Sequence, residues 1–208
     1  MVVAVMILGA VAEAVGWTLV AARGRSVWRL MPWVLGAMGI VSAIALPPVA
    51  ATRVDAGFAF AVGLASGLLL YLGTLAFVAV ASRSVRFHRA VTSIYGEAAE
   101  VSVAISLVLS LAVMVPAEEL FWRGLFQAHL DEVWTAAAAA ATTWLAYVLA
   151  NLASRRPPIV AGAIVAGALW AVLAAWSGGV LASFASHMLW TGLMLALPPG
   201  AGREGRTA

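Results

Sequence analysis

Two adjacent carboxyl groups and one guanidinium stand within an apolar stretch of this sequence, 116-PAEELFWRGLFQ-127. If the stretch is an α-helix, Glu119 and Arg123 are four residues apart with the carboxylate on the N-terminal side, the favourable arrangement for a helical ion pair. Glu118 lies about 100° around the same helix and has no such partner. We therefore expect Arg123 to neutralise Glu119 and to leave Glu118 as a free carboxylate, the group that a general base acting on water requires.

The apolar surroundings make these ionisable groups costly. A charged side chain at the middle of a membrane-spanning helix costs about 2.5–3.5 kcal/mol on insertion scales, before any pairing. A purely structural ion pair between helices is the alternative interpretation, but such a pair would need only one of the two carboxylates. Glu13 stands alone in the first apolar stretch, and we interpret it as an interfacial residue or as the partner of an arginine.

Further polar side chains recur at intervals of four residues in other apolar stretches. They are Ser102, Ser106 and Ser110 ahead of Glu118, Tyr147 and Asn151 in the next stretch, and Ser183, His187 and Thr191 near the C-terminus. Residues four apart share one face of a helix, and polar faces of membrane helices turn toward the interior of a bundle. We therefore expect three helices to direct polar groups into a common interior. For Asn151, an interhelical hydrogen bond is as good an interpretation as a functional role.

The composition indicates which elements must hold these residues. The chain has 208 residues, of which 64% are hydrophobic and only 10% are charged, and its mean hydropathy is +1.02. This composition is typical of a polytopic membrane protein with an all-α fold. No cysteine is present, so disulfides, thiolate nucleophiles and cysteine-ligated metals are excluded. All 12 basic residues are arginines, and all but Arg123 lie in short connections or in the tail, a pattern that signals membrane topology and not nucleic-acid binding.

The apolar segments number seven, and the charges between them alternate. They span residues 2–22, 31–51, 57–81, 101–129, 135–153, 159–176 and 179–197. Arginines gather in every second connection: Arg23, Arg25 and Arg29; Arg83, Arg86 and Arg89; Arg155 and Arg156; and Arg203 and Arg206 in the tail. Positive residues mark cytoplasmic loops, so the pattern predicts a bundle of seven spans with the N-terminus outside and the C-terminus in the cytoplasm.

Three regions follow from this organisation. Residues 1–97 form an N-terminal three-helix membrane segment with a linker, and residues 82–100 of the connection are expected to lie as an amphipathic helix on the cytoplasmic surface. Residues 98–197 carry the polar stripes, and residues 198–208 are expected to be a disordered tail.

The motifs resemble those of one family. The sequence 118-EELFWR-123 resembles the EExxxR motif of the CAAX protease and bacteriocin-processing family, which are intramembrane glutamic endopeptidases. The sequences 147-YVLAN-151 and 187-HMLWT-191 are similar to its second motif, FxxxH, and its third, HxxxN or HxxxD, in the same order. The resemblance covers residues 98–197. Asn151 stands where the family has histidine, and Thr191 stands where it has asparagine or aspartate.

The resemblance implies a function and a role for each motif residue. Glu118 would be the general base, Arg123 would hold Glu119, and His187 would donate to the oxyanion with support from Thr191. Asn151 could only orient a water or a substrate amide, because an amide does not exchange a proton at neutral pH. The implied substrate is a membrane-embedded or membrane-anchored protein, with no metal, organic cofactor or nucleic acid involved. The implied location is the bilayer of a bacterial inner membrane.

Two other functions remain open. The departures at Asn151 and Thr191 fit a catalytically impaired relative that acts as a membrane scaffold or immunity-type factor. Intramembrane carboxylates such as Glu118 also serve as relays in proton-coupled transporters.

Overall fold

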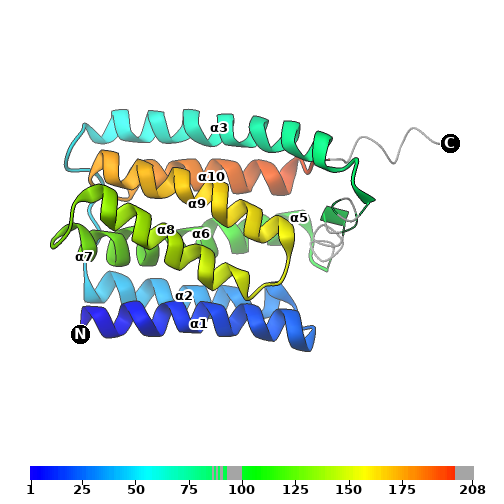
Figure 1. Cartoon of the computed structure of the whole chain (residues 1–208), viewed down its shortest axis with the longest axis horizontal. Helices are drawn as coiled ribbons and strands as arrows, with labels where there is room; N and C mark the ends of the chain where they lie inside the picture. Colours follow the sequence, from blue (N-terminus) through cyan, green and yellow to red (C-terminus); the bar gives the residue numbers. More distant parts are fainter. Residues whose placement is uncertain (86, 88, 90, 93–99, 200–208) are drawn as a thin grey trace.

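The structure is a computed structural model of the chain, and it describes residues 1–85, 87, 89, 91, 92 and 100–199. All regular structure in these residues is helical (Figure 1). The α-helices are α1 (Val2–Arg23), α2 (Val27–Ala45), α3 (Ala56–Ala81), α5 (Val103–Leu109), α6 (Val115–Glu118), α7 (Ala128–Asp131), α8 (Ala136–Leu152), α9 (Pro157–Ser177) and α10 (Leu181–Ala196). Two π-helical segments, η1 (Ser110–Met114) and η2 (Glu119–Gln127), join α5, α6 and α7 into one continuous rod.

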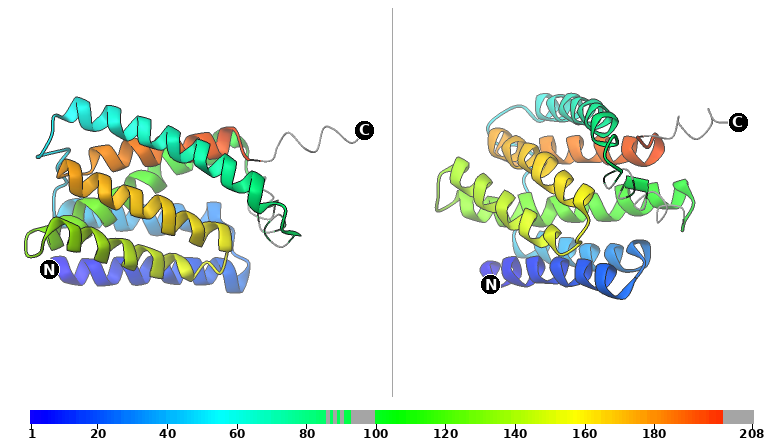
Figure 2. Two further views of the ribbon diagram at one scale, coloured as in Figure 1. Left: turned by 45° about the horizontal axis from the view of Figure 1, so that its top comes forward. Right: turned by 45° about the vertical axis from the view of Figure 1, so that its right-hand side comes forward.

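The helices lie side by side in a bundle whose centre is this rod. The pair α1 and α2 packs on one side, and the pair α3 and α10 packs on the opposite side (Figures 1 and 2). The hairpin of α8 and α9 closes the bundle, with α8 against α1 and η2 and α9 against α10. The central rod, with its charged motif, is therefore surrounded by helices from both halves of the chain.

Small residues bring the flanking helices close to the ones that carry the polar motifs. A Cβ added at Gly67 of α3 would lie 2.6 Å from the carbonyl oxygen of Ser186 on α10. A Cβ at Gly39 of α2 would lie 2.6 Å from the Cα of Ala117 on α6. In membranes, glycines let helix backbones approach closely and so replace the hydrophobic effect as a source of packing energy. These contacts fix the positions of Glu118 and His187, each next to one of the contacted residues.

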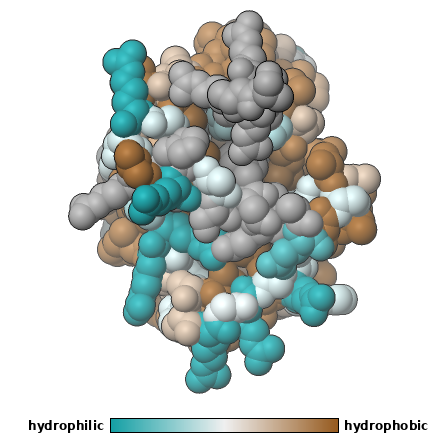
Figure 3. Space-filling model, turned by 90° about the vertical axis from the view of Figure 1, so that its right-hand side faces the viewer, coloured by the Kyte–Doolittle hydropathy of each residue, from teal (hydrophilic) through white to brown (hydrophobic). Residues whose placement is uncertain are grey.

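Hydrogen bonds tie together the connections at one end of the bundle. The α2–α3 loop contacts the α9–α10 turn through Thr52 N–H to Ser177 O (3.0 Å) and Val180 N–H to Val49 O (3.0 Å). Arg53 in the same loop forms a 2.7 Å ion pair with Asp131. The arginine-rich connections α1–α2 and α8–α9 lie at the other end, where hydrophilic side chains gather (Figure 3). The alternation of charge along the sequence thus corresponds to the two ends of the bundle.

The all-α architecture is as predicted, with differences in detail. In the described part of the chain, five helices are long and apolar enough to cross a membrane, and α8 and α10 are shorter apolar helices. The predicted segment 31–51 is wrong: α2 covers Val27–Ala45, because Pro47 and Pro48 cannot continue a helix. The α-helix predicted around Glu119 is also wrong, since residues 119–127 are π-helical. Most of the predicted amphipathic helix and the tail from residue 200 lie outside the described residues.

Candidate active site

The predicted ion pair between Glu119 and Arg123 is present and buried. The Nη1 atom of Arg123 lies 3.4 Å from Oε1 of Glu119, and both side chains are almost fully enclosed. The Nη2 atom of Arg123 donates to the carbonyl oxygen of Gly167 on α9 (3.3 Å), and the guanidinium lies over the rings of Tyr147 and Trp170. Both residues belong to η2, a π-helical segment of a kind found frequently at functional sites.

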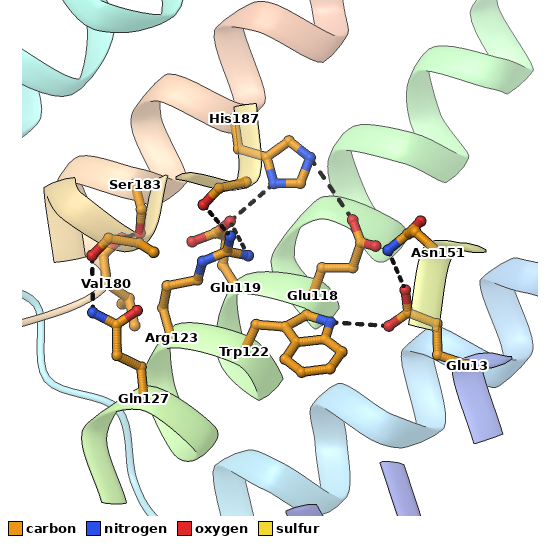
Figure 4. Close-up of polar contacts among 12 residues, drawn as sticks. Glu13, Glu118, Glu119, Trp122, Arg123, Gln127, Asn151, Val180, Ser183 and His187 are labelled. Atoms are coloured by element: carbon orange, nitrogen blue, oxygen red, sulfur yellow. Dashed lines mark hydrogen bonds and ion pairs between the residues drawn. The ribbon is translucent and has the colours of Figure 1, made fainter. Parts of the chain in front are cut away.

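The imidazole of His187 joins the two adjacent glutamates (Figure 4). Its Nδ1 atom lies 2.9 Å from Oε1 of Glu119, and its Nε2 atom lies 3.7 Å from Oε2 of Glu118. A carboxylate only accepts hydrogen bonds, so the proton of Nδ1 is donated to Glu119 and Nε2 faces Glu118. Trp170 stacks on the imidazole, with ring centres 3.6 Å apart, and restricts its rotation.

The carboxylate of Glu118 is free. Within the described residues it forms no hydrogen bond, and its only ion-pair contact is the one with His187. Its side chain is 12% exposed, whereas that of Glu119 is 1% exposed. The prediction from the spacing is therefore confirmed: Arg123 pairs with the carboxylate of Glu119, and the carboxylate of Glu118 remains available for another partner.

Glu118 and His187 line a cavity of about 610 Å³. Its remaining polar lining is Ser110, Tyr147, Asn151, Thr191 and Thr74. Its walls are largely apolar and come from α3 and α9, with Trp17 of α1 and Trp190 of α10. An apolar cavity of this volume with a few convergent polar groups is typical of a binding site for an organic substrate.

Asn151 and Tyr147 lie on the buried face of α8, as the four-residue spacing predicts. The Nδ2 atom of Asn151 donates to the carbonyl oxygen of Tyr147 (3.0 Å) and to Oε1 of Glu13 (3.0 Å). The carboxylate of Glu118 lies between the imidazole of His187 and the amide of Asn151 (Figure 4). Asn151 therefore reaches the same place as the glutamates.

The interpretation of Glu13 as an interfacial residue or as the partner of an arginine is wrong. Glu13 is fully buried at the centre of the bundle and not at a membrane interface. Its Oε2 atom accepts a hydrogen bond from Nε1 of Trp122 (2.9 Å), and its Oε1 atom accepts the one from Asn151. The cost of a lone charge within an apolar helix, about 2.5–3.5 kcal/mol, was a signal that Glu13 must have polar partners.

Thr191, Ser183 and Ser110 make fewer contacts within the site than the residues described above. Thr191 lies in the cavity wall one turn after His187, and its hydroxyl has no hydrogen-bond partner within the described part of the chain. Ser183 is buried and donates to the carbonyl oxygen of Val180 (3.0 Å), while Ser110 lines the cavity. Among the described residues, no group of three or more histidines, aspartates and glutamates has an arrangement that could hold a metal ion.

Comparison with known proteins agrees with the motifs. Residues 100–193 match the family model described as Type II CAAX prenyl endopeptidase Rce1-like. The match includes every predicted motif residue from Glu118 to Thr191 and leaves α1, with Glu13, outside it. No curated protein and no solved structure matches the chain. The resemblance predicted from the EExxxR motif is confirmed: residues 100–193 of this integral membrane protein are similar to the Rce1-like CAAX protease family.

Proposed function

We propose that the protein is an intramembrane endopeptidase in which Glu118 activates the water that cleaves a peptide bond. The observation that carries this proposal is the free carboxylate of Glu118 in the wall of the 610 Å³ cavity, 3.7 Å from Nε2 of His187. A general base must lie within hydrogen-bond reach of the water it deprotonates. A water placed beside Glu118 in the cavity meets this condition.

The reaction divides into two steps. In the first, a proton passes from water to the carboxylate of Glu118 while the water oxygen attacks the carbonyl carbon of the substrate. In the second, Glu118 returns the proton to the leaving nitrogen as the C–N bond breaks. His187 in its imidazolium form offers Nε2–H to the oxyanion between these steps, and the hydroxyl of Thr191 is placed one turn away to support it.

Glu119 and Arg123 position His187 and do not take part in the proton transfer. Glu119 accepts Nδ1–H at 2.9 Å, and its charge stabilises the imidazolium that the oxyanion role requires. Arg123 keeps Glu119 in place through the 3.4 Å ion pair. This arrangement resembles the carboxylate that orients the histidine of a catalytic triad.

The substrate is a membrane-embedded or membrane-anchored protein. The cavity walls are apolar, and α1, α3 and α9, which contribute to them, are long and apolar enough to cross a membrane. The arginine-rich end of the bundle, in a topology of seven spans with the N-terminus outside, would face the cytoplasm of a bacterial cell. Substrate would then enter from the plane of the membrane or from that side.

The test compares termini of membrane proteins in the native host, by mass spectrometry, between wild type and Glu118→Gln. Uncleaved precursors are expected in Glu118→Gln cells and not in cells with Glu132→Gln, a control that removes an exposed carboxyl group at the C-terminal end of the rod. Identical termini in all three strains, with the proteins stably inserted, would refute the endopeptidase.

A catalytically silent relative is the second candidate, and Asn151 favours it. Both amide hydrogens of Asn151 are already donated, and its side chain cannot accept a proton. Loss of one acid–base group typically lowers a rate by about 10²–10⁴-fold. If wild type shows no cleavage and Asn151→His restores it, the silent relative is the better description.

A further inference from the structure

A carboxylate from the first helix reaches the centre of the site. Glu13 belongs to α1 and lies outside residues 100–193, which match the family model. Its side chain is fully buried, and each of its two oxygens accepts one hydrogen bond from a group that does not titrate. The donors are the indole of Trp122 on η2 and the amide of Asn151 on α8 (Figure 4).

The two acceptors around Asn151 fix the direction of its amide. Nδ2 has two hydrogens, and they go to the backbone carbonyl of Tyr147 and to Glu13, each at 3.0 Å. If the amide were reversed, Oδ1 would face the carbonyl and the carboxylate, which are both acceptors. The reversed orientation would lose both hydrogen bonds, so Glu13 and Tyr147 select one orientation.

This orientation determines what Asn151 offers to a reacting water. Asn151 lines the cavity, and Oδ1 is the one polar atom of its side chain without a hydrogen bond within the described residues. A water beside Glu118 has two hydrogens, and general-base catalysis removes only one of them. An acceptor for the second hydrogen turns a lone pair of the water toward the substrate carbonyl.

We propose that Glu13 is a positioning residue of the site: it holds Asn151 so that Oδ1 accepts one hydrogen of the water whose other hydrogen goes to Glu118. The proposal rests on the endopeptidase function for the water, and on geometry alone for the orientation of Asn151. It accounts for an asparagine at this position, since a fixed carbonyl oxygen supplies the orientation of the water while Glu118 alone supplies the base. It also accounts for a buried carboxylate in a helix that has no other charge before Arg23.

A spectroscopic test reads the orientation without any substrate. Asn151 is the only asparagine of the chain, so protein made with side-chain ¹⁵N-labelled asparagine gives a single pair of amide signals. In wild type in detergent micelles, both amide hydrogens are expected to exchange slowly with water. In Glu13→Gln, one of them should exchange at least about tenfold faster or shift strongly, because the substituted amide side chain has one carbonyl oxygen for two donors.

Two further variants serve as a substitute and a control in this test. Glu13→Asp keeps the carboxylate and withdraws it by one methylene, so it gives the same readout if Glu13→Gln does not fold. Trp122→Phe removes the other hydrogen bond of Glu13 and should leave both Asn151 hydrogens protected. Unchanged exchange in both Glu13 variants would overturn the proposal, as would equal loss of protection in Trp122→Phe.

A kinetic cycle then separates positioning from a general structural role. Glu13→Gln should lower kcat by about 10–100-fold with little change in KM, because the water is misaligned and the substrate cavity is intact. In an Asn151→Ala background the same substitution should change kcat by less than about threefold. An equal loss in both backgrounds would show that Glu13 does not act through Asn151. If the amide hydrogens behave as expected and wild type cleaves nothing, the endopeptidase fails while the orientation of Asn151 by Glu13 stands.

Discussion

Removal of the guanidinium at Arg123 tests how the buried charges of the site are balanced. In Arg123→Met, Glu119 keeps its charge and loses the ion pair at 3.4 Å. Coulomb's law at an effective dielectric constant of 20 gives about 5 kcal/mol for this separation. Loss of one partner from a buried pair typically costs about 3–5 kcal/mol. We therefore expect the free energy of unfolding to fall by about 3–5 kcal/mol, with a further small loss from the hydrogen bond to Gly167.

The exposed ion pair between Arg53 and Asp131 is the matched control. Arg53 and Asp131 are closer, at 2.7 Å, but their side chains are 44% and 27% exposed. Solvent screens such pairs to about 0–1 kcal/mol. Asp131→Asn should therefore change the free energy of unfolding by less than about 1 kcal/mol, even though its ion pair has the shorter distance.

The assay is thermal unfolding in a mild detergent, followed by circular dichroism. For a chain of this length, about 1 kcal/mol corresponds to about 2–4 °C in Tm, so Arg123→Met should unfold at least about 6 °C lower. The double variant Glu119→Gln with Arg123→Met removes both charges and should recover most of this loss. A Tm shift in Arg123→Met no larger than that in Asp131→Asn, or a double variant as unstable as the single one, would refute this account of the charges.

The packing of α3 on α10 and the orientation of the bundle give two further predictions. Gly67→Ala should lower Tm, because the added Cβ would lie 2.6 Å from the carbonyl oxygen of Ser186. Gly73→Ala on the same helix is the control: its Cβ would meet nothing within 4 Å, so Tm should stay within about 2 °C of wild type. Since the chain has no cysteine, single introduced cysteines report on which side of the membrane each end of the bundle lies. A membrane-impermeant maleimide added to intact cells should label Glu132→Cys and not Arg25→Cys. The reverse labelling pattern would refute a cytoplasmic location of the arginine-rich end.

Sequence spacing predicted the parts of the site that lie within one helix. Glu119 and Arg123, Tyr147 and Asn151, and the buried face with Ser183 and His187 all follow from residues four apart sharing a helix face. The interaction of the whole set could not be predicted in this way. His187 contacts Glu119 across 68 residues and Glu13 contacts Asn151 across 138, and such distances depend on how helices pack. Local periodicity contains no information about that packing.

The backbone of the central rod was also beyond prediction. An α-helix and a π-helix differ by one residue in the hydrogen-bond register, and both keep Glu119 and Arg123 on nearby faces. The spacing alone therefore predicted the ion pair of Glu119 and Arg123 correctly but placed it on an α-helix instead of a π-helix. The wrong helix type matters most for Glu118, because the angle between the Glu118 and Glu119 side chains around the helix decides whether Glu118 reaches His187 or faces another helix.

Glu118 distinguishes a functional cluster from a structural ion pair. A structural pair needs Glu119 and Arg123 alone, and Glu118 adds a charge with no hydrogen bond within the described residues at the edge of an apolar cavity. A group retained for chemistry is commonly unfavourable for stability, and its replacement typically yields about 0.5–2 kcal/mol. Glu118→Leu should therefore raise Tm by about 1–8 °C while cleavage is lost. If Glu118→Leu instead unfolds at a lower temperature than wild type, Glu118 stabilises the bundle, and its place in the site has a structural explanation.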